Sequence, residues 1–208
     1  MMTKRNIRNQ LAPARGRVAK RLSVSGASSR VKLPAADAGF QVWGEAAHAL
    51  MLEYREAWHR NHQNPGDCEF QKQLAIAEDL VDLAYSLAYP PRFWETMPAL
   101  LAGKSVDLEP FISYLEADPY CFRSGYIKSK TLRGLKRASM SPAQRLRLQY
   151  VVLCVDDKGF RREFRDYCRL ARFIYTPGFI ADLESRLNSF DPNRALRAKW
   201  VIDACLKP

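Results

Sequence analysis

The segment KGFRREFRDYCRLARFIY, residues 158–175, carries two side-chain stripes at helical spacing. On a helix of about 100° per residue, one stripe is apolar and the other, about a third of a turn away, is basic. The apolar stripe contains Phe160, Phe164, Tyr167, Cys168 and Ala171, and the basic stripe contains Arg161, Arg165, Arg169 and Arg172. A helix in a layered helical protein buries one such stripe against its neighbours, so the segment predicts an all-α fold with these rings in the core.

The basic stripe has no evident partner within the segment. Glu163 and Asp166 project to another side of the expected helix, so we expect little neutralisation along it. Rings that alternate with arginines in sequence also suggest a stacking surface for single-stranded nucleic acid. The helical projection separates the two sets and favours a core role for the rings.

Helical periodicity extends over most of the chain after about residue 44. We expect helices over about 44–62, 68–87, 123–137 and 159–174. The segment RLRLQYVVLCV, residues 145–155, alternates apolar and polar residues as a strand would. The strong helix start at Ser141-Pro142, and the absence of a second candidate strand in the sequence, favour a helix there.

Proline recurs where helices are expected to begin. The starts are Leu108-Glu109-Pro110, Ser141-Pro142, Thr176-Pro177 and Asp191-Pro192. Three of them follow a side chain that can cap a helix. From Pro110 to Pro142 is 32 residues and from Pro142 to Pro177 is 35. A spacing in the thirties that holds two helices is typical of a helix-hairpin solenoid.

The segment SFDPNRALRAKWVIDACL, residues 189–206, resembles the second helix of a HEAT-type repeat. Asp191-Pro192 opens it, and the step Leu196-Arg197 precedes small residues; RSGYIKSKTLRGLKR, residues 123–137, is similar. Trp200 departs from the pattern, which usually has a small residue there. The resemblance implies a HEAT-like stack of about eight or nine helices, an α-solenoid whose usual work is binding. Some HEAT-like proteins are DNA glycosylases, but no residue here matches their motif.

Charge is divided into blocks that the net charge of +11 hides. Residues 1–39 have nine basic side chains and one acidic side chain. Residues 40–122 have five basic and thirteen acidic ones, and residues 123–174 have fourteen basic and four acidic ones. We therefore expect a disordered basic tail over 1–40 and one helical-repeat domain over 41–208, with an acidic part at 41–104 and basic repeats at 105–208.

Four interpretations of the tail stay open: a nucleic-acid-binding arm, an arm for a membrane surface or protein partner, an organelle transit peptide, and an inert leader. The five scattered cysteines contain no CxxC pair, which is typical of a reducing compartment. No apolar run reaches the roughly 20 residues of a membrane span, and no apolar leader segment begins the chain. We expect a cytoplasmic protein.

The basic block predicts a binding surface. Its residues are Lys128, Lys130, Arg133, Lys136, Arg137, Arg161, Arg162, Arg165, Arg169 and Arg172, with Arg145 and Arg147 nearby. We expect a non-enzymatic helical-repeat adaptor that presents this surface to an acidic protein partner. The alternative is a nucleic-acid-binding protein that uses the tail and the 123–172 surface on phosphates. Docking of the acidic block on the basic one is a third possibility.

Two clusters raise the question of a chemical site. His59 and His62, with Cys68 or Asp67, have a spacing that could hold a metal ion, but a solvated helix end explains them equally well. The adjacent carboxylates of Asp156-Asp157 could serve general acid-base catalysis, but such a pair more often belongs to a turn at the end of a helix. No nucleophile elbow, phosphate loop or dinucleotide fingerprint is present in the sequence. We predict no catalytic residue, no metal site and no cofactor.

Overall fold

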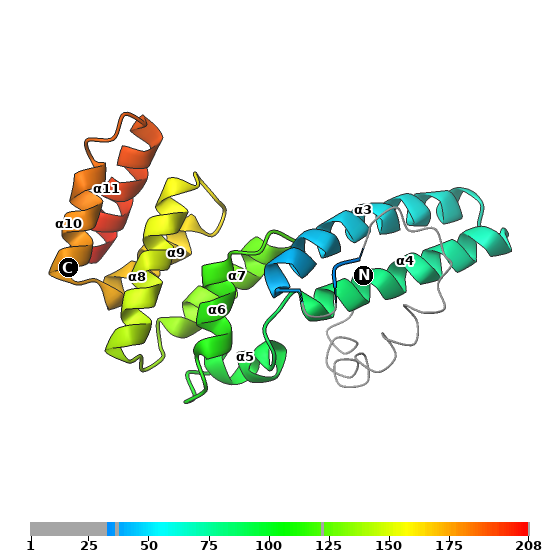
Figure 1. The fold of residues 1–208 in the computed structure, drawn as a ribbon, viewed down its shortest axis with the longest axis horizontal. Coiled ribbons are helices and arrows are strands. Elements are labelled where there is room, and N and C mark those ends of the chain that lie inside the picture. The colour runs from blue at the N-terminus through cyan, green and yellow to red at the C-terminus, as the bar shows by residue number, and fades with distance from the viewer. Residues whose placement is uncertain (1–32, 36–37, 122, 208) are drawn as a thin grey trace. The chain divides into compact units, whose positions relative to one another are not determined.

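The computed structural model describes residues 33–35, 38–121 and 123–207, and the regular structure within them is entirely helical (Figure 1). The expected all-α fold is confirmed for these residues. The helices are α3 (Phe40–Gln63), α4 (Cys68–Leu87), α5 (Phe93–Leu101), α6 (Glu109–Ala117), α7 (Ser124–Leu135), α8 (Pro142–Asp157), α9 (Phe164–Ile174), α10 (Pro177–Arg186) and α11 (Pro192–Leu206). Nearly all of the predicted tail, residues 1–40, lies outside the described residues.

Side-chain caps set several helix starts, as the sequence predicts. Asp67 accepts backbone N–H groups at the start of α4. Ser141 and Gln144 form a reciprocal capping box at the start of α8. Thr176 accepts the backbone N–H of Phe179 at the start of α10, and Asp191 accepts that of Asn193 at the start of α11. In α8, α10 and α11 the residue after the cap is a proline that opens the helix, where its missing N–H costs nothing.

The helical ranges agree with expectation except at α3 and α9. The segment 145–155 lies within α8, so its helical interpretation is confirmed. Helix α4 has the predicted bounds, and α3 begins four residues before the expected start at 44. Helix α9 begins at Phe164, because Gly159 adopts a φ of 99° after α8 and the chain reaches the helix only after a turn.

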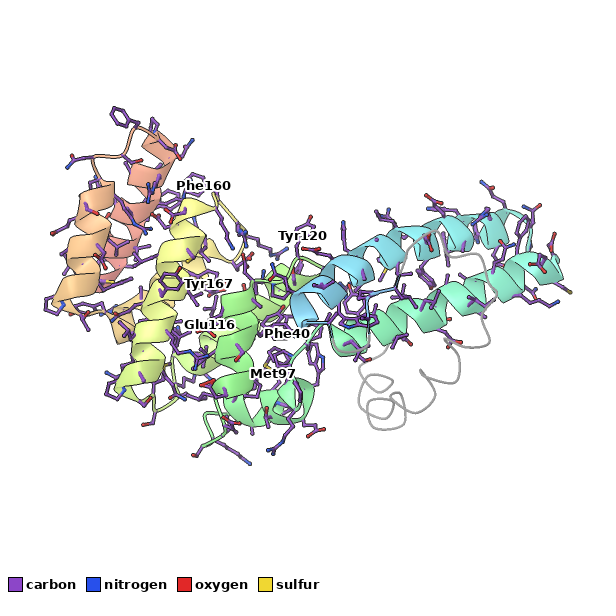
Figure 2. All side chains as sticks on the ribbon, in the orientation of Figure 1. Phe40, Met97, Glu116, Tyr120, Phe160 and Tyr167 are labelled. Carbon is purple, nitrogen blue, oxygen red and sulfur yellow. The ribbon has the colours of Figure 1, made fainter. Side chains whose placement is uncertain are left out.

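The late start of α9 corrects the placement of one ring. Phe164 and Tyr167 are buried, as the apolar stripe predicts. Phe160 lies before the helix, so the helical projection does not apply to it, and its side chain is exposed. Figure 2 shows Phe160 in the connection before α9 and Tyr167 further along the chain within the helices.

The described helices form two compact units. In the first unit, α3 and α4 pack as a hairpin. The segment 117–121 joins this unit: a Cβ on Gly44 would lie 3.0 Å from the Cβ of Pro119, and the rings of His48 and Tyr120 meet edge-on at 5.0 Å. The main segment of the first unit ends at Pro91.

The second unit contains α5 and α7 to α11, with most of α6. Helix α5 packs on α7, α7 on α9 and α9 on α11, while α8 packs on α9 and α10 on α11. Figure 1 shows α8 and α9 between α7 and the α10–α11 pair. Close contact at Gly134, where a Cβ would lie 2.6 Å from Leu100, explains why α5 belongs to this unit. None of the described helices is long and apolar enough to span a bilayer.

Candidate functional site

Helices α7 and α9 lie side by side, and contacts between their side chains occur at three levels along them. From start to end, the pairs are Tyr126 with Arg162, Arg133 with Asp166, and Lys136 with Phe173. The residue numbers rise together on both helices, so the two helices run in the same direction. Their solvent-exposed faces are therefore adjacent on one side of the second unit, while α8 packs on another side of α9.

This pair of exposed faces is strongly basic. We call it the basic face, and we include the cations that directly adjoin the two helices; Lys136 is half-buried and the others are exposed. The basic face consists of Lys130, Arg133, Lys136, Arg137, Arg162, Arg165, Arg169 and Arg172. Helix α7 contains no acidic residue. On α9 the acidic residue is Asp166, which is buried, and Glu163 just before α9 is buried as well. The basic face therefore presents no exposed carboxylate within α7 or α9.

Two residues of the predicted surface do not belong to the basic face. Lys128 is only 2% exposed and lies in the interior of the second unit, so its assignment to a surface is wrong. Arg161, unlike the exposed Arg162 beside it, is half-buried and is engaged in an interaction within the fold. The buried carboxylate of Glu163 lies against the first turn of α7, where a Cβ on Gly125 would meet it at 2.8 Å. A helix N-terminus favours such an anion.

Asp166 joins two arginines of the basic face. Its carboxylate accepts hydrogen bonds from Arg133 at 3.2 and 3.3 Å and from Arg169 at 3.1 Å. The expectation that Asp166 lies away from the arginines is wrong, because Arg169 is three residues further along the same helix. Burial opposes ionisation of Asp166, but hydrogen bonds from Arg133, Ser129 and Arg169 outweigh it and lower the pKa of this carboxyl.

The lowered pKa of Asp166 predicts a pH-dependent contribution to stability. The pKa of Asp166 in the folded state lies below the unfolded value of about 3.9. The ionised carboxylate therefore stabilises the fold above about pH 4. This contribution is lost as the pH falls through the folded pKa. We expect Asp166→Asn to lower the free energy of unfolding by about 1 kcal/mol at neutral pH. Urea unfolding should show this difference shrinking below about pH 4; a difference that stays constant on acidification would contradict the prediction.

Three cations of the basic face have no described partner. Arg165 and Arg172 are exposed on α9, and Lys130 is exposed on α7. None of them forms an ion pair or hydrogen bond within the described residues. Arg165 and Arg172 are two helical turns apart, about 10 Å along the axis.

Other basic residues of the second unit are engaged in the fold. Arg147, expected near the surface, pairs with Glu109 at 2.5 Å and with Glu116 at 2.7 Å. The Asp156-Asp157 pair is part of an ion-pair network that joins α8 to α10 and α11. Arg186 forms ion pairs with both aspartates. Arg194 pairs with Asp157, and Arg197 pairs with Asp156. These contacts give both aspartates a structural role.

Half-exposed aromatic rings flank the basic face, and the sequence interpretation missed them. Tyr126 is 49% exposed and Phe173 is 53% exposed, both between α7 and α9. Phe160 and Trp200 are 48% and 42% exposed, and their ring centroids are 5.1 Å apart where α9 meets α11. The spacing in the sequence could have indicated two of these rings. Tyr126 is four residues from Lys130, and Phe173 is four residues from Arg169, so each ring lies on the same side of its helix as a cation of the basic face.

The histidine cluster in the first unit has other contacts. The ring of Trp58 stacks on that of His62 with an interplanar angle of 5°, and it meets the ring of His59 edge-on. The Asp67 carboxylate accepts backbone N–H groups as the cap of α4. Among the residues that the structure describes, no group of three potential ligands could hold a metal ion. Trp58, His59, Tyr54 and Arg55 line an open hollow of about 250 Å³.

Comparison with family models, curated proteins and solved structures finds no match for this chain. The chemistry of the basic face therefore carries the functional inference.

Proposed function

We propose that the second unit is a nucleic-acid-binding module whose basic face contacts phosphate groups. The observation that carries the proposal is the set of exposed, unpaired cations, Lys130, Arg165 and Arg172, on a face without exposed carboxylates. Such a face attracts polyanions, and phosphates are the most regularly spaced anions that a protein meets. Half-exposed rings beside the cations favour nucleic acid over an acidic protein partner, because bases have faces on which rings stack.

The proposal includes a HEAT-like helix-hairpin stack for α5–α11. Its support is the packing of every second helix on the next, α5 on α7, α7 on α9 and α9 on α11. Tyr126 and Arg162 are 36 residues apart, and Phe164 and Trp200, which are also in ring contact, are 36 residues apart as well. In such a stack each repeat presents the same helix face, so cations on α7 and α9 extend one continuous surface.

The dependence of affinity on salt tests the proposal. We expect the full chain to bind oligonucleotides at about 50 mM salt without strong sequence preference. About four phosphate contacts predict a log–log slope of about −3 on a single strand, or roughly a fiftyfold loss of affinity between about 50 and 200 mM salt. Fluorescence anisotropy with labelled single strands and duplexes of DNA and RNA measures both quantities.

The competing adaptor hypothesis gives a different result in the same assay. If an acidic protein is the ligand, we expect no detectable binding to any of the four nucleic acids, even at about 50 mM salt. That result would overturn the nucleic-acid proposal. An affinity that does not change with salt would also overturn it, because phosphate contacts release bound counterions.

A further inference from the structure

We infer that the nucleic acid is single-stranded and that its bases stack on the exposed rings at the two edges of the α9 basic face. This inference rests on the proposed function and adds the class of ligand. Phe173 and Tyr126 form the edge beside α7, and Phe160 and Trp200 form the edge beside α11. The unpaired Arg165 and Arg172 lie on α9, the helix between these edges.

The exposed rings differ from the rings that hold the fold together. Phe164 and Tyr167 are at most 2% exposed and pack inside the second unit. Phe173, on the same helix, has about half of its surface in water although Ile174 beside it is buried. A single exposed ring is common on a protein surface. Four half-exposed rings that border one cationic face match the combination found in single-strand binding surfaces, where a basic groove follows the backbone and rings stack on bases.

Cations already accompany two of the rings. The Arg162 guanidinium carbon lies 3.6 Å from the centroid of the Tyr126 ring, and the Lys136 amine lies 5.8 Å from that of Phe173. The planar guanidinium leaves its outer face open to a base, as arginine planes do in RNA recognition. The edge beside α7 therefore offers a flat surface next to a charge that suits a phosphate.

The arrangement of the helices argues against a duplex ligand. In a duplex the base faces are stacked on one another, so protein rings reach them only after unpairing. Groove reading requires one helix or ribbon that protrudes into a groove about 12 Å wide. Helix α9 instead lies beside α7 and α11, packed against both, so it cannot enter a groove alone. A single strand carries its phosphates and its base faces to this surface together.

Truncation of one ring at each edge tests the inference. We expect Phe173→Ala and Trp200→Ala each to weaken binding of a single strand of about 12 nucleotides by about five- to a hundredfold, because a stacked base contributes about 1–3 kcal/mol. Affinity for a blunt duplex of the same length should change less than about twofold, and the salt slope on the single strand should stay unchanged, since no phosphate contact is lost. Homopolymers of DNA and RNA form separate arms of the measurement.

Three further variants separate stacking from folding. Trp200→Phe keeps a ring and should bind the single strand within about threefold of wild type. Phe173→Leu keeps apolar volume without a π-face and should lose nearly as much affinity as Phe173→Ala. Tyr150→Ala removes an exposed ring from α8, outside the basic face, and should bind as wild type does.

The outcomes distinguish the inference from the proposed function. Failure of the wild type to bind any nucleic acid overturns both. Binding of single strand and duplex with equal affinity, with ring variants that behave as wild type, overturns the inference and leaves the phosphate-binding function standing. Equal weakening of single-strand and duplex binding by the ring variants also overturns it, because that pattern indicates a structural role for the rings.

Discussion

A variant in which Arg165, Arg169 and Arg172 are all changed to Glu is expected to bind nucleic acid at least about a hundredfold more weakly than wild type at about 50 mM salt. Three charge-assisted contacts of about 1 kcal/mol or more each would be lost, and each tenfold change corresponds to about 1.4 kcal/mol. The log–log salt slope on a single strand should become shallower by about 2, since about 0.7 is lost for each phosphate contact.

A matched control is available in the first unit. Arg55 and Arg60 on α3 and Lys72 on α4 are exposed, and their change to Glu alters the net charge by the same amount. This control should retain most of the affinity if the basic face is the contact surface. Equal losses in both triple variants would contradict the assignment, because they would show that net charge alone governs binding.

Replacement of Asp156 by Ala is expected to lower the free energy of unfolding by about 3 kcal/mol. Asp156 is fully buried, and its carboxylate accepts a hydrogen bond from Arg186 at 3.1 Å. Arg197, 3% exposed, donates to the backbone carbonyl of Asp156 at 2.6 Å and has its Nε 4.0 Å from the carboxylate. Loss of the carboxylate removes the nearest anion of Arg186, and it leaves the buried Arg197 with Asp191, 3.6 Å away, as its remaining ion-pair partner. The remaining backbone carbonyl keeps the cost at the lower end of the range for a broken buried pair.

Two neighbouring variants calibrate the effect of Asp156→Ala. Asp157→Ala removes a half-exposed carboxylate that pairs with Arg194 at 2.7 Å, and we expect a loss below about 1 kcal/mol. Asp156→Asn should lower the free energy of unfolding by less than half as much as Asp156→Ala. Burial raises the pKa of Asp156 despite Arg186 and Arg197, so desolvation already offsets much of the stabilisation that its charge provides. Urea unfolding followed by circular dichroism at neutral pH measures all three. A loss below about 1 kcal/mol for Asp156→Ala would show that Arg197 does not need the carboxylate.

Local chemistry explains which helix bounds could be predicted. The caps Asp67, Ser141, Thr176 and Asp191 act on backbone groups within three residues, so their effect does not depend on distant parts of the chain. The start of α9 was misplaced because periodicity alone was extended back through Gly159, whose positive φ redirects the chain. This one error put Phe160 in the core, and it lies at the surface.

The sequence predicted every cation of the basic face, but it did not predict which of them are paired or that Lys128 is buried. Arginines at helical spacing showed where the basic face would be. The Arg133–Asp166 ion pair joins helices through residues 33 positions apart in sequence, and the burial of Lys128 depends on the packing around α7. Spacing along one helix carries no information about such partners, so the choice between paired and unpaired cations required the packed structure.

Sequence alone determined the helical class, most helix starts and the concentration of positive charge, since capping, periodicity and charge are local properties of the chain. Tertiary packing decided the two units, the engagement of Arg147 and Arg197 in the fold, and the exposure of Phe160, Phe173 and Trp200. The physical reason is that burial and ion pairing depend on neighbours brought together from distant positions. Three arginines of the stripe that the sequence left unexplained, Arg165, Arg169 and Arg172, belong in the folded protein to a cationic face bordered by rings.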